Sequence, residues 1–194
     1  MTSNSFSVLR GENLECVRND IILFSGLSVA VNDGEVLQVK GPNGCGKTSL
    51  LRILCGLAIP NEGAVYWNDR DIREYNGEYV EHISYVGHQN GTKKELTPSE
   101  NLRVSTALSY LSNGTTPEQA LEQFGLYGYE DTPVGKLSSG QQRRVALSRL
   151  LLTRANLWIL DEPFTSVDDA GGMLILVSHE PVQIPGVSIR ELIL

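Results

Sequence analysis

Apolar and polar residues follow two different periods along this chain, and the change of period marks its organisation. Short apolar runs rich in β-branched residues, separated by Gly, Asn and Asp, occupy the first 90 residues. This pattern is typical of strands joined by turns. We predict strands at residues 21–24, 27–31, 35–40, 65–67 and 82–86, with a hairpin-type turn at residues 32–34.

The apolar spacing becomes helical between residues 97 and 152. Thr97-Pro98-Ser99-Glu100 and Thr116-Pro117-Glu118 have the form of helix starts, and a third helix follows at residues 138–152. Residues 157–160 and 173–177 are uninterrupted apolar runs, as expected of buried parallel strands. The predicted fold class is α/β, with a β excursion before the core and a helical excursion within it.

Composition narrows the classes of protein that fit. The 194 residues contain 16 Lys and Arg against 23 Asp and Glu, so the formal charge of −7 gives no general attraction to nucleic acid. Three cysteines without CxxC spacing fit a reducing compartment. The sequence contains neither a signal-peptide pattern nor an apolar window long enough to span a bilayer. We therefore expect one cytoplasmic domain with no nucleic-acid partner.

A glycine-rich segment, GPNGCGKT, is the first motif with a chemical meaning. It matches GxxxxGK[ST] and lies between a predicted strand and an apolar helix at residues 50–57. In such a loop backbone N–H groups turn toward a polyphosphate, Lys47 reaches the β- and γ-phosphates and the Thr48 hydroxyl ligates Mg²⁺. The predicted nucleotide-binding residues are Gly41, Pro42, Asn43, Gly44, Cys45, Gly46, Lys47, Thr48 and Ser49.

Two adjacent carboxylates follow the apolar run at residues 157–160. A buried strand would place Asp161 at the mouth of the sheet, where it can hold Mg²⁺ directly or through water. Glu162 would lie one step further out and accept a proton from an attacking water. Alone, this sequence is usually a polar turn, but downstream of a phosphate loop it favours ATP hydrolysis.

The segment LSSGQ opens the predicted helix at residues 138–152. Here the sequence resembles the ATP-binding-cassette (ABC) superfamily, whose LSGGQ signature it matches with Ser139 in place of the first glycine. In that family the signature of one subunit contacts the γ-phosphate held by another, which implies a homodimer in the ATP-bound state with Ser138 and Gly140 on the γ-phosphate. The predicted signature residues are Leu137, Ser138, Ser139, Gly140 and Gln141.

The resemblance implies further site residues. Gln89 corresponds to the Q-loop glutamine, which touches the metal and the water, and His179 corresponds to the switch histidine on the γ-phosphate. Ser166 and Asp168 belong to the D-loop. The family commonly stacks an aromatic residue on adenine, and the nearest counterpart here is Arg18, whose guanidinium plane can also stack on a base.

Other polar residues receive no role in this interpretation. His82 and His88 are interpreted as surface or loop histidines. The four arginines after the signature are interpreted as a solvated helix face. They are Arg143, Arg144, Arg149 and Arg154.

Within the superfamily the chain is most similar to the ATP-binding subunits of cytochrome c maturation (haem export) systems. Residues 23–28, 48–57, 87–102 and 141–149 carry this similarity. It implies a peripheral subunit on the cytoplasmic face of the inner membrane, bound to integral-membrane permease subunits, with no direct haem ligand singled out. The family pattern divides the single domain into a core and β subdomain, about residues 1–90 and 155–194, and a helical subdomain, about residues 91–154.

The connection between the Asp161 strand and the His179 strand is unusually short. The family places these strands side by side and parallel, but Glu162 to Gly172 is only 11 residues, and four remain after the D-loop. Four extended residues span about 14 Å, too little for a normal parallel return. Three explanations remain open: a straightened D-loop, a different pairing of residues 173–177, or a segment missing from this chain. A lost crossover helix would also uncover one face of the sheet.

Three functions remain to be separated. The leading hypothesis is an ATP hydrolase of the haem-export type, with ATP and Mg²⁺ as ligands and Glu162, His179, Lys47 and Gln89 as catalytic residues. The alternative is a nucleotide-binding but non-hydrolysing subunit, inactive because its crossover is truncated. A soluble ABC ATPase acting on DNA or ribosomes is disfavoured by the acidic charge.

Overall fold

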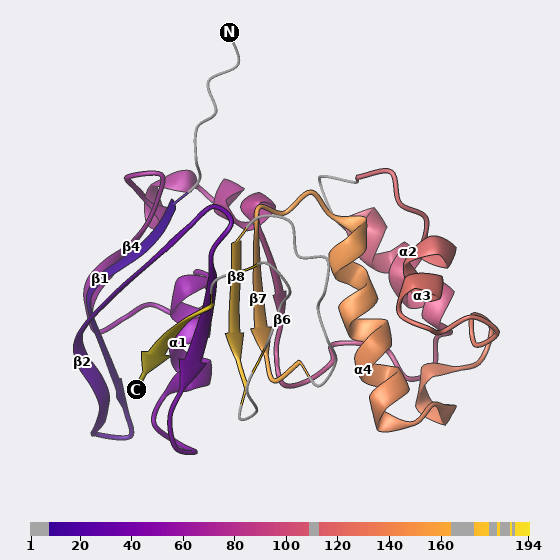
Figure 1. Cartoon of the computed structure of the whole chain (residues 1–194), viewed down its shortest axis with the longest axis horizontal. Coiled ribbons are helices and arrows are strands. Elements are labelled where there is room, and N and C mark those ends of the chain that lie inside the picture. Colours follow the sequence, from indigo (N-terminus) through magenta and orange to yellow (C-terminus); the bar gives the residue numbers. More distant parts are fainter. Residues whose placement is uncertain (1–7, 109–112, 164–172, 179–181, 183–186, 188) are drawn as a thin grey trace, which may run out of the picture.

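Two β-sheets with a helix between them form the body of the molecule. The computed structural model describes residues 8–108, 113–163, 173–178, 182, 187 and 189–194. Helix α1 (Lys47–Leu54) contacts β1 of one sheet and β7 and β8 of the other. Figure 1 shows three further helices, α2, α3 and α4, beyond the β6 edge of the second sheet. This layering is the α/β arrangement that the sequence predicts, with the antiparallel sheet and the helical part as its two excursions.

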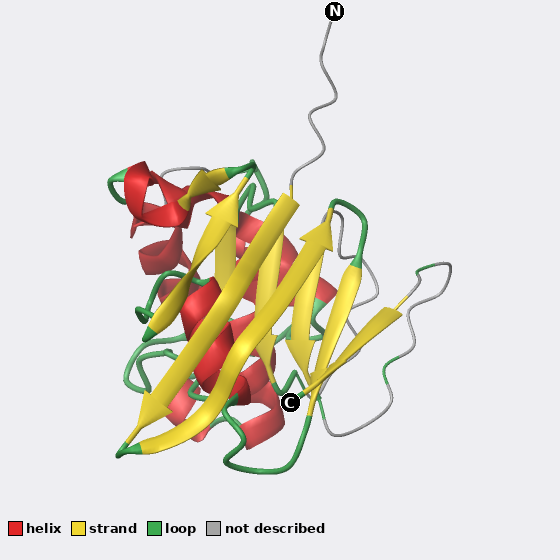
Figure 2. Ribbon diagram, turned by 90° about the vertical axis from the view of Figure 1, so that its left-hand side faces the viewer, coloured by secondary structure: helices red, strands yellow, loops and turns green. Residues whose placement is uncertain are grey.

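The first sheet is antiparallel, with the order β2-β1-β4-β5. Its long strands lie across α1 in Figure 2. Asn19 and Asp20 both have positive φ, as a two-residue hairpin between β1 and β2 requires. The two strands predicted at 21–24 and 27–31 are one continuous strand with irregular register. The strands are β1 (Val8–Arg18), β2 (Ile21–Asn32), β4 (Glu62–Trp67) and β5 (Arg70–Asp71).

The second sheet is parallel throughout, with the order β6-β7-β8-β3-β9. Every residue of β7 and β8 is buried, which explains their uninterrupted apolar sequences. Strand β8 is not the last strand of this sheet, because β9 follows it in the chain and lies at the edge beside β3. The strands are β3 (Val36–Lys40), β6 (Ile83–Val86), β7 (Leu157–Asp161), β8 (Met173–Val177) and β9 (Ile189–Ile193).

The turn at residues 32–34 is not the predicted hairpin. It closes with a hydrogen bond from the Glu35 N–H to the Asn32 carbonyl, and Gly34 supplies the positive φ. However, β2 and β3 belong to different sheets, so this turn carries the chain from one sheet to the other. The physical reason is the burial of β3 on both faces, which suits a central parallel strand.

The helices begin where the capping signals predict. Thr116 and Ser138 each accept a hydrogen bond from the backbone N–H three residues later, and the Gln at that position bonds back. The helix predicted at residues 138–152 consists of an α-helix followed directly by a 3₁₀ helix. The remaining elements are α2 (Pro98–Leu108), α3 (Pro117–Gln123), α4 (Ser139–Ser148) and the 3₁₀ helices η1 (Ile72–Tyr75), η2 (Glu78–His82), η3 (Val134–Lys136) and η4 (Arg149–Leu152).

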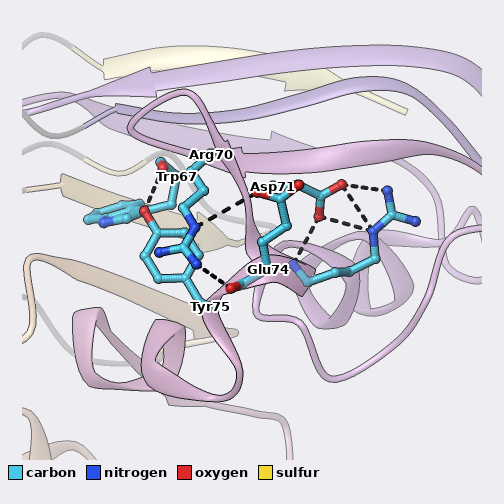
Figure 3. Close-up of polar contacts among 6 residues, drawn as sticks. Trp67, Arg70, Asp71, Glu74 and Tyr75 are labelled. Carbon is cyan, nitrogen blue, oxygen red and sulfur yellow. Dashed lines mark hydrogen bonds and ion pairs between the residues drawn. The ribbon is translucent and has the colours of Figure 1, made fainter.

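An aromatic cluster closes the antiparallel sheet over the end of α1. The His82 ring stacks on Trp67 at 5.5 Å, and the buried Tyr79 hydroxyl donates to the Leu54 carbonyl at 2.7 Å. Figure 3 shows the Tyr75 hydroxyl bonded to the Trp67 carbonyl and the Arg70 guanidinium over the Tyr75 ring. His82 is therefore part of a packed cluster.

The pairing of β7 with β8 settles one question about the short connection. The register runs from Leu157 opposite Met173 to Asp161 opposite Val177, in parallel. The explanation that residues 173–177 pair differently is therefore wrong. Most of the connection, residues 164–172, lies outside the described residues.

The sheet face expected to be uncovered is buried. Leu174 and Leu176 of β8 and Trp158 of β7 belong to an apolar cluster against which Val182 and Val187 pack. The chain after β8 therefore contributes to covering the face that a longer crossover would otherwise cover.

Gly63, at the start of β4, tests the packing of β4 on β1. A Cβ at this position would lie 2.3 Å from the Glu12 carbonyl oxygen, and φ is +84°. Gly63→Ala should therefore lower the free energy of unfolding by about 2 kcal/mol or more, measured by urea unfolding. Gly77→Ala is the control. Its φ is +94°, but an added Cβ would meet no atom of the described residues within 4 Å, so this substitution should lower the free energy of unfolding by only about 1 kcal/mol. Equal losses in the two variants would contradict this account.

Candidate nucleotide-binding site

The phosphate loop joins the buried strand β3 to α1. Gly44 and Gly46 have φ of +83° and +105°, a conformation that glycine adopts without strain. Lys47 is buried and its Nζ donates to the carbonyls of Gly41 at 2.8 Å and Pro42 at 2.9 Å. Helix α1 starts without a side-chain cap, so its first N–H groups suit an anion. The structure thus brings Gly44, Gly46 and Lys47 of the predicted loop together at the start of α1.

Two residues of β2 support the loop from behind. A Cβ on Gly46 would lie 3.1 Å from the Leu23 Cβ and from the Phe24 ring. A Cβ on Gly41 would lie 2.7 Å from the Cys45 Sγ. Sequence reasoning assigned no such role to Leu23 or Phe24, because the two segments are far apart in the chain.

The phosphate loop and the end of β7 are in direct contact. The Thr48 hydroxyl donates to the Asp161 Oδ2 at 2.8 Å, and Asp161 is buried. Among the described residues there is no group of three or more His, Cys, Asp and Glu that could hold a metal. Mg²⁺ bound with nucleotide usually takes one or two protein oxygens and several phosphate or water oxygens. Thr48 and Asp161 fit that requirement.

Glu162 follows Asp161 in a left-handed backbone conformation, with φ of +55°. Its N–H donates to the Val177 carbonyl at 2.9 Å, so the residue stays tied to β8. The Glu162 Oε2 lies 3.7 Å from the Nδ1 of His88. His88 was interpreted as a loop histidine without a role, and the structure places it beside the predicted general base. Gln89 is the next residue and is exposed in the same loop.

The predicted solvated face does not include Arg143 and Arg144 of α4 or Arg149 of the adjoining η4. Arg143 is only 4 % exposed and reaches the Gly87 carbonyl, while Arg149 is half-buried and donates to the Asn90 carbonyl. Arg144 donates to the carbonyl of Phe124. These guanidiniums donate to backbone carbonyls instead of to water. Counting charges along the sequence cannot reveal such contacts.

Arg154 alone of the four is exposed as predicted. Burial lowers the pKa of Arg143 and of Arg149, but the usual value is so high that both stay charged.

The signature residues lie at an exposed helix start. Leu137 is buried and anchors the segment, whereas Ser138, Ser139 and Gly140 are exposed. Within the part of the chain that the structure describes, a Cβ on Gly140 would meet nothing within 4 Å beyond its own helix, so this position is open. The signature could therefore be reached by another molecule.

The remaining predicted residues are less defined. Arg18 is exposed at the hairpin between β1 and β2, and its contact with adenine stays a prediction. Ser166, Asp168 and His179 lie outside the described residues. Ser178, just before His179, has its carbonyl bonded by the Gln38 side chain of β3 at 3.4 Å.

Comparison with known proteins identifies the family. Residues 24–165 match the family model described as ABC transporter. The chain belongs to the ABC transporter family. It is 46 % identical to the cytochrome c biogenesis ATP-binding export protein CcmA of Nitrosomonas europaea, over 96 % of this chain and 95 % of that protein. The CcmA protein of Escherichia coli K12 is 44 % identical over 95 % of each chain.

Solved structures agree with this fold. An ABC transporter ATP-binding protein from Pyrococcus furiosus has a TM-score of 0.78 at 23 % identity and covers 95 % of this chain and 97 % of its own. A dimeric ATP-binding cassette bound to ADP and phosphate has a TM-score of 0.74 at 22 % identity, over 89 % and 88 %. These structures show that the chain has the fold of an ATP-binding cassette, in agreement with the family match. Among the described residues, no helix is long and apolar enough to cross a membrane.

The alignment with the Nitrosomonas europaea protein contains gaps in this chain. The first relative aligns over 203 positions, more than the 194 residues of this chain, although only 96 % of the chain is included. The alignment therefore contains positions at which the relative has a residue and this chain has none. A segment that this chain lacks, the third explanation of the short connection, would add such positions to an alignment.

The bond between Thr48 and Asp161 gives a test of the site without nucleotide. Thr48→Val removes the hydroxyl donor from a buried carboxylate oxygen and should lower the free energy of unfolding by about 1 to 3 kcal/mol. Thr48→Ser keeps the hydroxyl and should stay within about 0.5 kcal/mol of the native protein, as ordinary surface substitutions do. Urea unfolding of the two variants measures the difference, and equal stability would show that the bond contributes nothing.

Proposed function

We propose that this chain hydrolyses ATP to drive a haem-export system of cytochrome c biogenesis. The observation that carries the chemistry is the contact between Thr48 of the phosphate loop and Asp161, with Glu162 as the next residue. The similarity to CcmA proteins over nearly the whole chain supports the export role. The alternative of a non-hydrolysing subunit receives no support from these relatives.

Each residue of the site has a role in this proposal. Lys47 exchanges its loop carbonyls for the β- and γ-phosphates of ATP. Thr48 and Asp161 hold Mg²⁺, which neutralises charge on the phosphates when it is bound. Glu162 accepts the proton of the attacking water, and Gln89 supports the metal and the water.

His179 completes the site by orienting the water on the γ-phosphate. The pairing of β8 with β7 and β3 supports this role, because that strand leads directly to Ser178 and His179. The proposed role of His179 therefore does not require a longer connection between β7 and β8.

The signature residues act on a second copy of the chain. Ser138 and Gly140 stand at an exposed helix start with open space before them, as contact with another subunit's γ-phosphate requires. In this proposal the chain forms a homodimer around ATP and binds permease subunits at the cytoplasmic face of the inner membrane. A dimer with ADP and phosphate among the similar structures supports the arrangement.

Glu162→Gln tests the hydrolytic mechanism. The variant keeps the shape of the side chain but cannot accept a proton, so turnover should fall by about 10² to 10⁴ while ATP binding is retained. Mg²⁺-dependent phosphate release, measured over a range of protein concentrations with and without the permease subunits, gives the rate. A rate that rises more than linearly with concentration indicates the dimer. Unchanged turnover in Glu162→Gln would rule out its role as the base.

Lys47→Ala is the companion variant, because it removes the cation that meets the phosphates. It should lose ATP binding as well as turnover. Native protein that binds ATP but shows no turnover even with its permease partners would favour the non-hydrolysing alternative.

Ser138→Ala tests the signature, with Thr116→Ala as a matched control. Both serve as caps in equivalent capping boxes, so each substitution should lower the free energy of unfolding by about 1 kcal/mol. Only Ser138→Ala should also reduce turnover, by about a hundredfold if its hydroxyl meets the γ-phosphate. Equal effects of the two substitutions on turnover would show that Ser138 acts only as a helix cap.

A further inference from the structure

Arg143 of α4 connects the ends of two strands of the parallel sheet. Its Nη1 donates to the Gly87 carbonyl after β6 at 2.6 Å and to the Asn90 Oδ1 at 3.2 Å. Its Nη2 donates to the carbonyl of Asp161 at 2.6 Å and of Glu162 at 3.2 Å. One planar guanidinium thus holds the start of the loop that carries Gln89 and the segment that carries Glu162.

Packing alone does not explain this residue. Arg143 is 4 % exposed, and its Nε has no hydrogen-bond partner among the residues that the structure describes. Burying a cation is costly, and an apolar side chain of similar volume is often at least as stable in such a place. The positions of the four oxygen atoms that accept from Arg143 therefore explain this residue better than packing does.

The acceptors lie where the backbone needs support. Glu162 has φ of +55°, a conformation that costs a non-glycine residue about 1 kcal/mol or more and persists only when neighbours impose it. The groups that hold it include the Val177 carbonyl, which accepts from its N–H, and the Arg143 guanidinium, which donates to its own carbonyl. The direction of the Glu162 side chain follows from this backbone conformation.

The same helix carries the signature. Ser138 caps the exposed start of α4, while Arg143, five residues later, points into the protein. Figure 1 shows α4 beside β6 and β7, and its residues Ala146 and Leu147 pack against these strands. A shift of α4 would therefore displace Arg143 relative to the ends of β6 and β7.

We propose that Arg143 is a positioning residue for ATP hydrolysis, which sets the backbone of Glu162 from the signature helix. It touches neither nucleotide nor water itself. This inference rests on the proposed function, because it assumes that Glu162 is the base.

The test compares Arg143→Gln and Arg143→Lys with Arg144→Gln. Arg144 lies on the same helix and also donates to backbone carbonyls, those of Phe124 and Gly125, but these belong to the helical part. Arg143→Gln should reduce kcat at least tenfold while the Kd for ATP changes less than threefold. Arg143→Lys keeps the charge but lacks the planar fork that reaches both strand ends, so its kcat should lie in between. Arg144→Gln should stay within twofold of the native kcat.

A second measurement separates positioning from folding. If Arg143 acts through Glu162, the variant Arg143→Gln combined with Glu162→Gln should turn over no more slowly than Glu162→Gln alone. Unfolding midpoints are recorded for every variant, and if Arg143→Gln does not fold, Arg143→Lys decides.

The outcomes are distinguishable. A kcat within twofold of native in Arg143→Gln, equal losses in Arg144→Gln, a parallel loss of ATP affinity, or a further loss in the double variant would each overturn the inference. In those cases a large loss in Glu162→Gln would leave the proposed function standing. Native turnover in Glu162→Gln would instead remove the proposed base and this inference with it.

Discussion

The parallel pairing of β6, β7, β8 and β3 determines where the candidate catalytic groups lie. Because all four strands run in the same direction, their carboxyl ends meet at one edge of the sheet. Asp161 is the last residue of β7, and Gly87, Ser178 and Gly41 directly follow β6, β8 and β3. Thr48 reaches Asp161 only because β3 and β7 both border β8. Without this pairing, the motifs would be separate turns with no shared chemistry.

The sequence predicted the parts of this arrangement that depend on local pattern. The phosphate loop, the carboxylate pair and the capped start of α4 are short motifs whose geometry follows from glycine freedom, strand burial and helix capping. The contact between Thr48 and Asp161 could also be expected, since a phosphate loop and a carboxylate at a strand end meet at the same edge.

What the sequence missed depends on contacts between distant segments. Nothing near His88 in the chain shows that Glu162 lies 3.7 Å from it. The arginine spacing after the signature looked like a solvated face, because the carbonyls that accept from Arg143 belong to Gly87 and Asp161, which are 56 and 18 residues away in the sequence. Strand β9 was missed because its sequence, Ile-Arg-Glu-Leu-Ile, neither alternates between apolar and polar residues nor forms an uninterrupted apolar run. Periodicity describes one segment at a time, so it cannot report such partners.

The short connection matters less to the site than chain length suggests. The position of β8 is set on both sides, because its residues pair with β7 and with β3. Its first N–H groups donate to the carbonyls of Asn156 and Glu35, which lie just before those two strands. Hydrogen bonds to two neighbours fix a strand's register whatever the length of the loop that leads to it. A crossover helix would therefore chiefly cover the sheet, and Val182 and Val187 already contribute to that cover.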